Sequence, residues 1–247
     1  MNLMNNAFWI GGRHAVIAAI KNKNRKIERI LVDQSLNKND INEISNLYKK
    51  KIELIKKNQI KKLFLDKNFV HQGFAALLSP LGSVSLKDFI KLDLGNNILL
   101  PILEDINDPR NLGSILRSCV AFGAYYVIIK DNSINEKSPY LYKAASGACE
   151  KINFIKVSNI SSAIKILKQQ KFWIYGTDLK SSQYMHNIKL STGRYAMIFG
   201  SEHSGIKRLT KENCDILFKI KMWGEIESLN VSSSCAIILN YFSNQLK

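Results

Sequence analysis

From residue 98 onward, short apolar runs alternate with stretches whose apolar residues have helical spacing. The runs predict strands at 98–103, 125–130, 152–156, 172–176 and 195–199, and the stretches between them predict helices at 112–122, 139–148 and 160–170. Apolar runs of this kind are typical of strands that are covered on both faces. Their alternation with helices favours a mostly parallel sheet. The sequence therefore predicts an α/β domain over residues 97–247.

The N-terminal part predicts a second, smaller α/β domain. Strands are expected at 27–33, 52–55 and 72–78, with helices at 14–20, 40–50 and 59–65. Turn residues at 79–83 end this pattern. We therefore expect a domain over residues 1–78 and a linker over 79–96.

The charge balance points to a polyanionic partner. Thirty-six Lys and Arg side chains stand against 20 Asp and Glu, which gives a formal net charge of +16. Such an excess favours nucleic-acid binding, although an AT-rich genome also raises Lys content.

The four cysteines form no C-x-x-C pair, so we expect reduced thiols and no metal.

The sequence gives no sign of a membrane protein. No apolar run reaches the roughly 18 to 20 residues that cross a bilayer. The first residues lack a basic stretch followed by an apolar one, so they do not form a signal peptide. A cytoplasmic protein without a membrane partner is expected.

Two polar segments near the C-terminus could carry chemistry. Gly200, Glu202 and Gly205 directly follow an apolar strand, in the position where α/β proteins bind ligands. Ser228 and Asn230 precede an apolar helix, and their side chains can accept hydrogen bonds from its free N–H groups. An ordinary turn and an ordinary helix cap explain each segment when it is taken alone.

A third segment opens the helix predicted at 112–122. Asn111 suits the N-cap of this helix. Arg117 has apolar neighbours in the sequence, so we expect it to be buried and to need an anionic partner or a ligand.

No G-x-G-x-x-G follows a strand, and neither a P-loop nor a G-x-S-x-G elbow occurs, which disfavours dinucleotide binding and serine hydrolysis.

Together the three segments resemble the motifs of the SpoU class of SPOUT RNA methyltransferases. The resemblance rests on N-x-G-x-x-x-R at 111–117, G-x-E-x-x-G at 200–205 and S-L-N-V-S at 228–232, in this order. The N-terminal part, with residues 8–19 and 71–73, is similar to the L30e-like substrate-binding domain of members that modify 23S rRNA. Nearly the whole chain is covered by these similarities.

The resemblance implies methyl transfer from S-adenosylmethionine to the ribose 2′-hydroxyl of a guanosine in 23S rRNA. It also implies a homodimer and a deep trefoil knot, an exception to the rule that chains are unknotted. The implied catalytic residues are Asn111, Arg117, Glu202, Ser228 and Asn230, and the implied cofactor-binding residues are Gly200, Ile220 and Leu229. Gly200 is expected to be small so that backbone can approach the cofactor closely.

The role of Arg117 can be narrowed by its chemistry. A guanidinium rarely loses its proton, so we expect Arg117 to clamp an RNA phosphate and polarise the 2′-oxygen rather than act as a general base. Two other functions stay open, a tRNA guanosine 2′-O-methyltransferase and a non-catalytic RNA-binding or ribosome-assembly factor. The N-terminal domain argues against the first, and the intact motif residues argue against the second.

Overall fold

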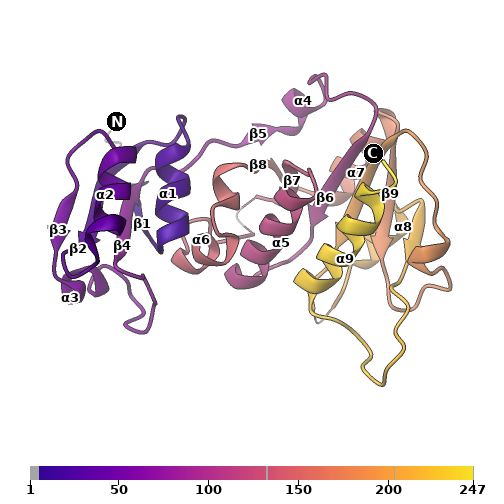
Figure 1. Ribbon diagram of the computed structural model, residues 1–247. Coiled ribbons are helices and arrows are strands. Elements are labelled where there is room, and N and C mark those ends of the chain that lie inside the picture. Colours follow the sequence, from indigo (N-terminus) through magenta and orange to yellow (C-terminus); the bar gives the residue numbers. More distant parts are fainter. Residues whose placement is uncertain (1–5, 132, 203, 247) are drawn as a thin grey trace. The chain divides into compact units, whose positions relative to one another are not determined.

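The computed structural model describes residues 6–131, 133–202 and 204–246 (Figure 1). By internal contacts the chain divides into two compact units. Unit 1 comprises Met1–Gly82 and Asn135–Lys151, and unit 2 comprises Ser83–Ile134 and Ile152–Lys247. Residues 135–151, which the sequence-based division assigns to the C-terminal domain, therefore pack with the N-terminal part.

Unit 2 is built on a seven-stranded sheet in which every neighbouring pair of strands is parallel. Across the sheet the strands lie in the order β11 (Ile216–Phe218), β9 (Phe172–Thr177), β10 (Arg194–Phe199), β6 (Ile98–Leu103), β7 (Tyr126–Lys130), β8 (Asn153–Val157) and β5 (Val84–Ser85). The predicted α/β domain with a mostly parallel sheet is confirmed.

The helices of unit 2 are α4 (Leu86–Phe89), α5 (Pro109–Ala121), α7 (Ile160–Gln169), α8 (Arg208–Glu212), α9 (Val231–Ser243) and the 3-10 turn η3 (Met185–Asn187). One face of the sheet shares a buried core with α7, to which Ile102, Ile174 and Ile198 contribute from the strands and Ile164 and Leu167 from the helix. The long helices α5 and α9 pack against each other (Figure 1). This contact brings two sequence segments that are far apart, 109–121 and 231–243, side by side.

Helix α5 begins earlier than the sequence predicts. Pro109 occupies its first turn, and the Asp108 side chain is the N-cap, with its Oδ1 2.8 Å from the Arg110 backbone N. The interpretation of Asn111 as an N-cap is therefore wrong. Because Asp108 takes that role, the Asn111 amide is free to bond elsewhere.

Unit 1 contains a four-stranded mixed sheet in the order β1 (Phe8–Gly11), β4 (Phe74–Leu78), β2 (Ile27–Asp33) and β3 (Glu53–Ile55). Its helices are α1 (Arg13–Lys21), α2 (Lys38–Leu47), α3 (Lys57–Lys61), α6 (Pro139–Ala145) and the 3-10 turn η2 (Ala148–Glu150). Strand β1 is not predicted from the sequence, because Gly11 and Gly12 indicate a turn there. Gly11 instead ends the strand, and Gly12, with φ of 107°, precedes α1.

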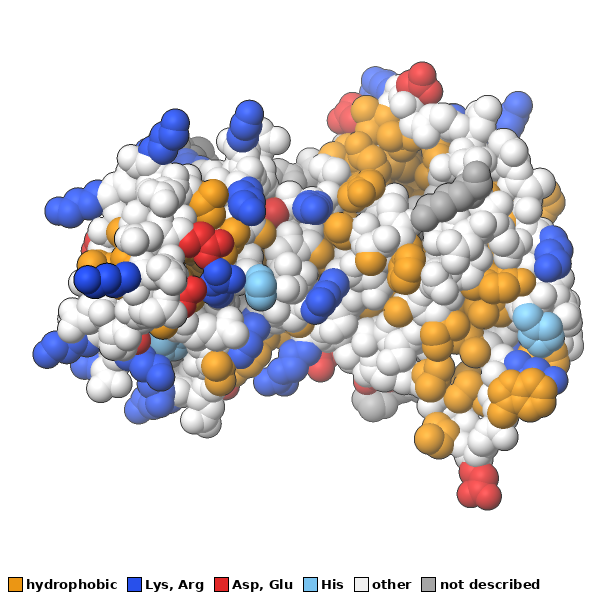
Figure 2. All heavy atoms as spheres, viewed as in Figure 1, with side chains coloured by type: hydrophobic (Ala, Val, Ile, Leu, Met, Phe, Trp, Pro, Cys, Tyr) orange, Lys and Arg blue, Asp and Glu red, His pale blue; other side chains and the backbone are white. Residues whose placement is uncertain are grey.

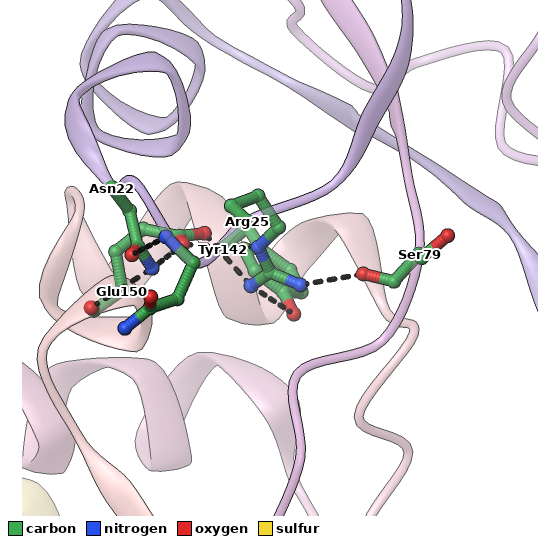
Figure 3. A network of polar contacts seen from close by, with 6 residues as sticks. Asn22, Arg25, Ser79, Tyr142 and Glu150 are labelled. Carbon is green, nitrogen blue, oxygen red and sulfur yellow. Dashed lines mark hydrogen bonds and ion pairs between the residues drawn. The ribbon is translucent and has the colours of Figure 1, made fainter.

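A buried ion pair joins residues 135–151 to the rest of unit 1 (Figure 3). Arg25 donates to both carboxylate oxygens of Glu150, from Nε at 3.0 Å and from Nη2 at 2.8 Å. Arg25 Nη1 also donates to the Ser79 carbonyl at 2.8 Å, and the Asn22 amide donates to Glu150 at 2.8 Å. Burial lowers the pKa of Arg25, but its bonds to Glu150 outweigh this effect, so the pKa is raised overall.

Candidate active site

Three side chains from distant parts of unit 2 meet in a cluster that is open to solvent. Asn111 lies in the first turn of α5, Glu202 follows β10, and Asn230 precedes α9. The Asn111 amide donates to Glu202 Oε1 at 3.0 Å, and the Asn230 amide donates to the same oxygen and, at 3.0 Å, to Asn111 Oδ1. The carboxylate is thereby held in one orientation by two amides.

Asn230 is also the N-cap of α9. Its Oδ1 accepts from the backbone N of Ser232 at 2.8 Å and from the Ser232 hydroxyl at 2.6 Å. The expectation that Asn230 caps the last helix is confirmed. Both ends of its amide are used, so the start of α9 and the position of Glu202 depend on one side chain.

The loop after β10 closes tightly on itself. The Gly205 N–H donates to the Ser201 carbonyl at 2.9 Å, and Gly205 has φ of 63°. A Cβ on Gly200 would lie 2.1 Å from the carbonyl carbon of Gly205. Glycine is thus required at position 200 by the neighbouring turn of the loop, a reason different from the close approach of a cofactor that the sequence implies.

A cavity of about 370 Å³ lies where β9, β10 and β11 reach their carboxyl ends. Its size falls within the range of about 300–1,000 Å³ that is typical of small-molecule sites. The lining residues come from five parts of the chain: Thr177, Asp178, Leu179, Lys180, Phe199, Gly200, Ser201, Glu202, Ser204, Gly205, Lys211, Phe218, Lys219, Ile220, Met222, Ser228, Leu229, Val231, Ser234 and Ile238.

The structure brings most of the expected site residues to this cavity. Gly200, Ile220 and Leu229 line it, together with Ser228 and Glu202. Asn111 and Asn230 do not line it but bond to Glu202 in its wall. An ion pair between Lys211 Nζ and Asp178 Oδ1, 3.0 Å apart, completes the wall.

Arg117 is not part of the cluster. It lies on α5, six residues after Asn111, which places it about 9 Å further along the helix axis and on another side of the helix. Its side chain is exposed, and it makes no hydrogen bond or ion pair with any residue that the structure describes. The expectation that Arg117 is buried is wrong, because the apolar neighbours of Arg117 in the sequence lie on other faces of α5.

Sequence reasoning missed a buried carboxylate that supports the loop. Glu104 directly follows β6 and is 3% exposed. Its carboxylate accepts from the Thr210 hydroxyl at 2.7 Å and from the Lys207 backbone N at 2.8 Å. These bonds anchor the chain just beyond Gly205. The only signal in the sequence was a carboxylate directly after an apolar strand.

The cysteines do not form a reactive site. Cys119, Cys149 and Cys235 are buried, and burial raises the pKa of the Cys214 thiol to about 12. Within the described ranges, no group of three or more His, Cys, Asp or Glu side chains could hold a metal ion. Also within those ranges, no helix is long and apolar enough to cross a membrane.

Comparisons with known proteins give the class of the protein. Residues 99–240 match the model of the SpoU rRNA Methylase family, and residues 9–83 match a model described as RNA 2'-O ribose methyltransferase substrate binding. The protein is therefore an S-adenosylmethionine-dependent RNA methyltransferase. The chain belongs to the SpoU methylase family, as its motifs indicate.

Individual relatives extend over almost the whole chain. A putative TrmH family tRNA/rRNA methyltransferase of Staphylococcus aureus (strain COL) is 34% identical over 232 residues, 93% of each chain. The 23S rRNA (guanosine-2'-O-)-methyltransferase RlmB of Xylella fastidiosa (strain Temecula1 / ATCC 700964) is 34% identical over 238 residues, 94% of each chain. The crystal structure of the SpoU methyltransferase AviRb from Streptomyces viridochromogenes, in complex with AdoMet, has a TM-score of 0.81 at 19% identity and covers 98% of this chain and 91% of that chain.

Proposed function

We propose that this protein methylates the ribose 2′-hydroxyl of a guanosine in 23S rRNA, with S-adenosylmethionine bound in the cavity of unit 2. The observation that carries the proposal is the Asn111–Glu202–Asn230 cluster beside a cavity walled by Gly200, Ile220 and Leu229. The guanosine and the 23S rRNA rest on the similarity to the Xylella fastidiosa relative, which extends over 94% of the chain. An rRNA substrate also implies that the protein acts in the cytoplasm.

The chemistry of the cavity fits S-adenosylmethionine. Apolar side chains, among them Ile220, Leu229 and Ile238, can cover a flat adenine ring, and the carboxylate of Asp178 and the hydroxyl of Ser228 can bond to polar groups of the ligand. The bound cofactor supplies an electrophilic methyl group. The residues of this chain have to hold that methyl group in line with the incoming 2′-oxygen.

Glu202 is the side chain best placed to orient the reacting groups. Two amides hold its carboxylate in position at the cavity wall. We infer that this carboxylate orients polar groups of the bound nucleotide. Ser228 lines the same cavity and provides a hydroxyl next to it.

Arg117 is proposed to act on the RNA rather than on the protein. Its exposed guanidinium can bind a phosphate in bidentate fashion and donate a hydrogen bond to the 2′-oxygen, which stabilises negative charge as that charge develops. The separation of Arg117 from Asn111 along α5 favours a site that a second copy of the chain completes. We therefore propose a homodimer in which Arg117 of one protomer serves the cavity of its partner.

Two features of the fold are part of the proposal. The chain passes from β10 over β9 to the edge strand β11 and then returns to pack α9 on α5. This path supports a trefoil knot that closes over the cavity.

The four-stranded sheet and helices of unit 1 support an L30e-like domain that binds RNA, and the substrate-binding family model matches residues 9–83. Figure 2 shows many Lys and Arg side chains on this part of the surface.

Label transfer tests the function. The protein is incubated with methyl-labelled S-adenosylmethionine and, separately, with purified 23S rRNA and tRNA, and the labelled nucleoside is identified by mass spectrometry. We expect 2′-O-methylguanosine in 23S rRNA, and little label with the Asn111→Ala variant. Label in tRNA alone would overturn the substrate in favour of a tRNA guanosine 2′-O-methyltransferase. Binding of RNA without any transfer would favour a non-catalytic RNA-binding or ribosome-assembly factor.

A further inference from the structure

A cluster of aromatic rings and ammonium groups lies beside the cavity of unit 2. This basic–aromatic patch consists of Tyr184, His186, Lys219, Lys221 and Trp223. Lys221 Nζ lies 4.0 Å from the centroid of the Trp223 ring, and Lys219 Nζ lies 5.1 Å from that of Tyr184. The Tyr184 and His186 rings are stacked, with 5.6 Å between their centroids. Hydrophobic, basic and histidine side chains gather toward the lower right of Figure 2.

The backbone beneath the patch is held in place from two sides. The Lys219 N–H donates to the Gln183 carbonyl at 2.9 Å, and the Met185 N–H donates to the Lys219 carbonyl at 2.8 Å. The Tyr241 hydroxyl of α9 donates to the His186 carbonyl at 3.1 Å. These bonds fix the segment that carries Tyr184 and His186, and the backbone of Lys219, before any ligand binds.

His186, Lys221 and Trp223 are exposed, and Tyr184 and Lys219 are half-buried. Trp223 is 86% exposed, which is unusual for so large an apolar ring. In the described part of the chain, neither Lys219 nor Lys221 has an ion-pair partner. Flat rings beside unneutralised ammonium groups match the two parts of a nucleotide, since bases stack on aromatic rings and phosphates bind cations.

We propose that the basic–aromatic patch binds a single-stranded nucleotide of the RNA substrate close to the methylated one. The base stacks on Trp223, and the backbone phosphate lies between Lys219 and Lys221. Lys219 also lines the cavity, as do Ile220 and Met222, so the bound nucleotide lies next to the site of methyl transfer. This inference rests on the proposed function and adds a second contact for the RNA.

The charge of the patch favours RNA over a second copy of the chain. Pairing this surface with another basic surface of the same chain, whose formal net charge is +16, would bring ammonium groups together without a counter-charge. A polyanion supplies that counter-charge at every phosphate. The observations therefore favour RNA as the partner of this surface.

Binding of a single-stranded RNA oligonucleotide that contains the target nucleotide tests the inference. Fluorescence anisotropy is measured with the full chain, with S-adenosylmethionine present. Trp223→Ala is expected to raise the Kd about tenfold, and Trp223→Phe, which keeps a ring, less than that. Lys221→Ala is expected to reduce the slope of log K against log salt by about 0.7. The matched controls are Trp173→Ala and Lys165→Ala, which remove an exposed Trp and an exposed Lys elsewhere in unit 2 and should change neither quantity.

The outcomes separate this inference from the proposed function. We expect Trp223→Ala to raise the KM for RNA while kcat at saturating RNA and the Kd for S-adenosylmethionine, measured by calorimetry, stay within about twofold of wild type. If Trp223→Ala binds RNA with wild-type affinity while the unchanged protein methylates RNA normally, the patch does not bind RNA. The proposed function would then still stand. Wild-type RNA affinity together with a smaller oligomer in light scattering would assign the patch to a second copy. Failure of the unchanged protein to bind or methylate RNA would overturn both.

Discussion

The side chains of Asn111 and Asn230 meet across 119 positions of the sequence, with Asn230 Nδ2 3.0 Å from Asn111 Oδ1. Both amides also donate to one oxygen of Glu202. Because Asn230 caps α9 with its other end, the helix contact between α5 and α9 and the orientation of the Glu202 carboxylate are set together. A change in packing at these helix starts is therefore transmitted directly to the wall of the cavity.

The two roles of Asn230 can be separated by substitution. Serine is as good an N-cap as asparagine but is too short to reach Asn111 and Glu202. Asn230→Ser is therefore expected to keep the free energy of unfolding within about 0.5 kcal/mol of wild type, while methyl transfer falls about a hundredfold because Glu202 is no longer held. Asn230→Ala should lose the same activity and also about 1 kcal/mol of stability. Urea unfolding measures the free energy of unfolding, and label transfer measures the activity. Full activity of Asn230→Ser would show that methyl transfer does not depend on the contact between Asn230 and Glu202.

Local patterns account for much of this fold. The strands predicted at 27–33 and 98–103 coincide with β2 and β6, the first from its alternating pattern and the second from its apolar run. β11 and α8 were not predicted as elements. They span only three and five residues, and β11 is defined by pairing with β9, a contact that leaves no local pattern.

In the candidate site, too, the sequence predicts what depends on neighbouring residues and misses what depends on distant contacts. The capping role of Asn230 depends only on the next two residues, so the sequence predicts it correctly. The contacts of Asn111, the buried position of Glu104 and the exposure of Arg117 depend on which helix face meets which loop. Apolar neighbours of Arg117 in the sequence, such as Leu116, are buried on other faces of α5, and this is why the expected burial failed.

Gly200 offers a test of the loop geometry. An alanine Cβ there would meet the Gly205 backbone at 2.1 Å, so the loop has to move. Gly200→Ala is expected to cost about 1–3 kcal/mol of stability and to abolish detectable binding of S-adenosylmethionine in calorimetry. Gly224→Ala is the control, since a Cβ at Gly224 meets nothing within 4 Å. Cofactor affinity that falls equally in both variants would contradict the role of the clash at Gly200.

The buried pair of Arg25 and Glu150 predicts a large effect on unit 1. Their side chains are 0% and 4% exposed, so Glu150→Ala leaves a guanidinium buried without its counter-charge. We expect a loss of about 3–5 kcal/mol, seen as faster hydrogen exchange at α1 and α6. Arg25→Met combined with Glu150→Leu should recover most of this loss.

The control for this pair is the pair of Arg29 and Glu53 in the same unit. It has the same two-bond geometry, with Nε at 2.8 Å and Nη2 at 2.6 Å from the two carboxylate oxygens, but its side chains are 50% and 39% exposed. Glu53→Ala is therefore expected to cost no more than about 1 kcal/mol. Equal losses for Glu150→Ala and Glu53→Ala would show that burial does not determine the strength of these pairs.

His71 makes the stability of unit 1 depend on pH. The imidazole is 4% exposed, and its Nδ1 accepts from the Gly73 N–H at 3.1 Å, so the neutral ring is the one that fits. Burial, together with the positive charge of Lys57, lowers the pKa of His71 below its usual value of about 6.5. The unfolded chain therefore takes up a proton first as the pH falls. The contribution of the neutral ring to stability is fully present above about pH 6.5 and is lost as the pH falls through the lower pKa of the folded state.

Asparagine at position 71 can accept the same hydrogen bond but does not titrate. His71→Asn is expected to be less stable than wild type at pH 7.5 because it loses the buried ring, yet its urea midpoint should fall less between pH 7.5 and 5. His14→Asn, at an exposed position of α1, should keep the wild-type pH dependence. If His71→Asn and wild type lose stability in parallel over this range, protonation of His71 does not drive the acid sensitivity of unit 1.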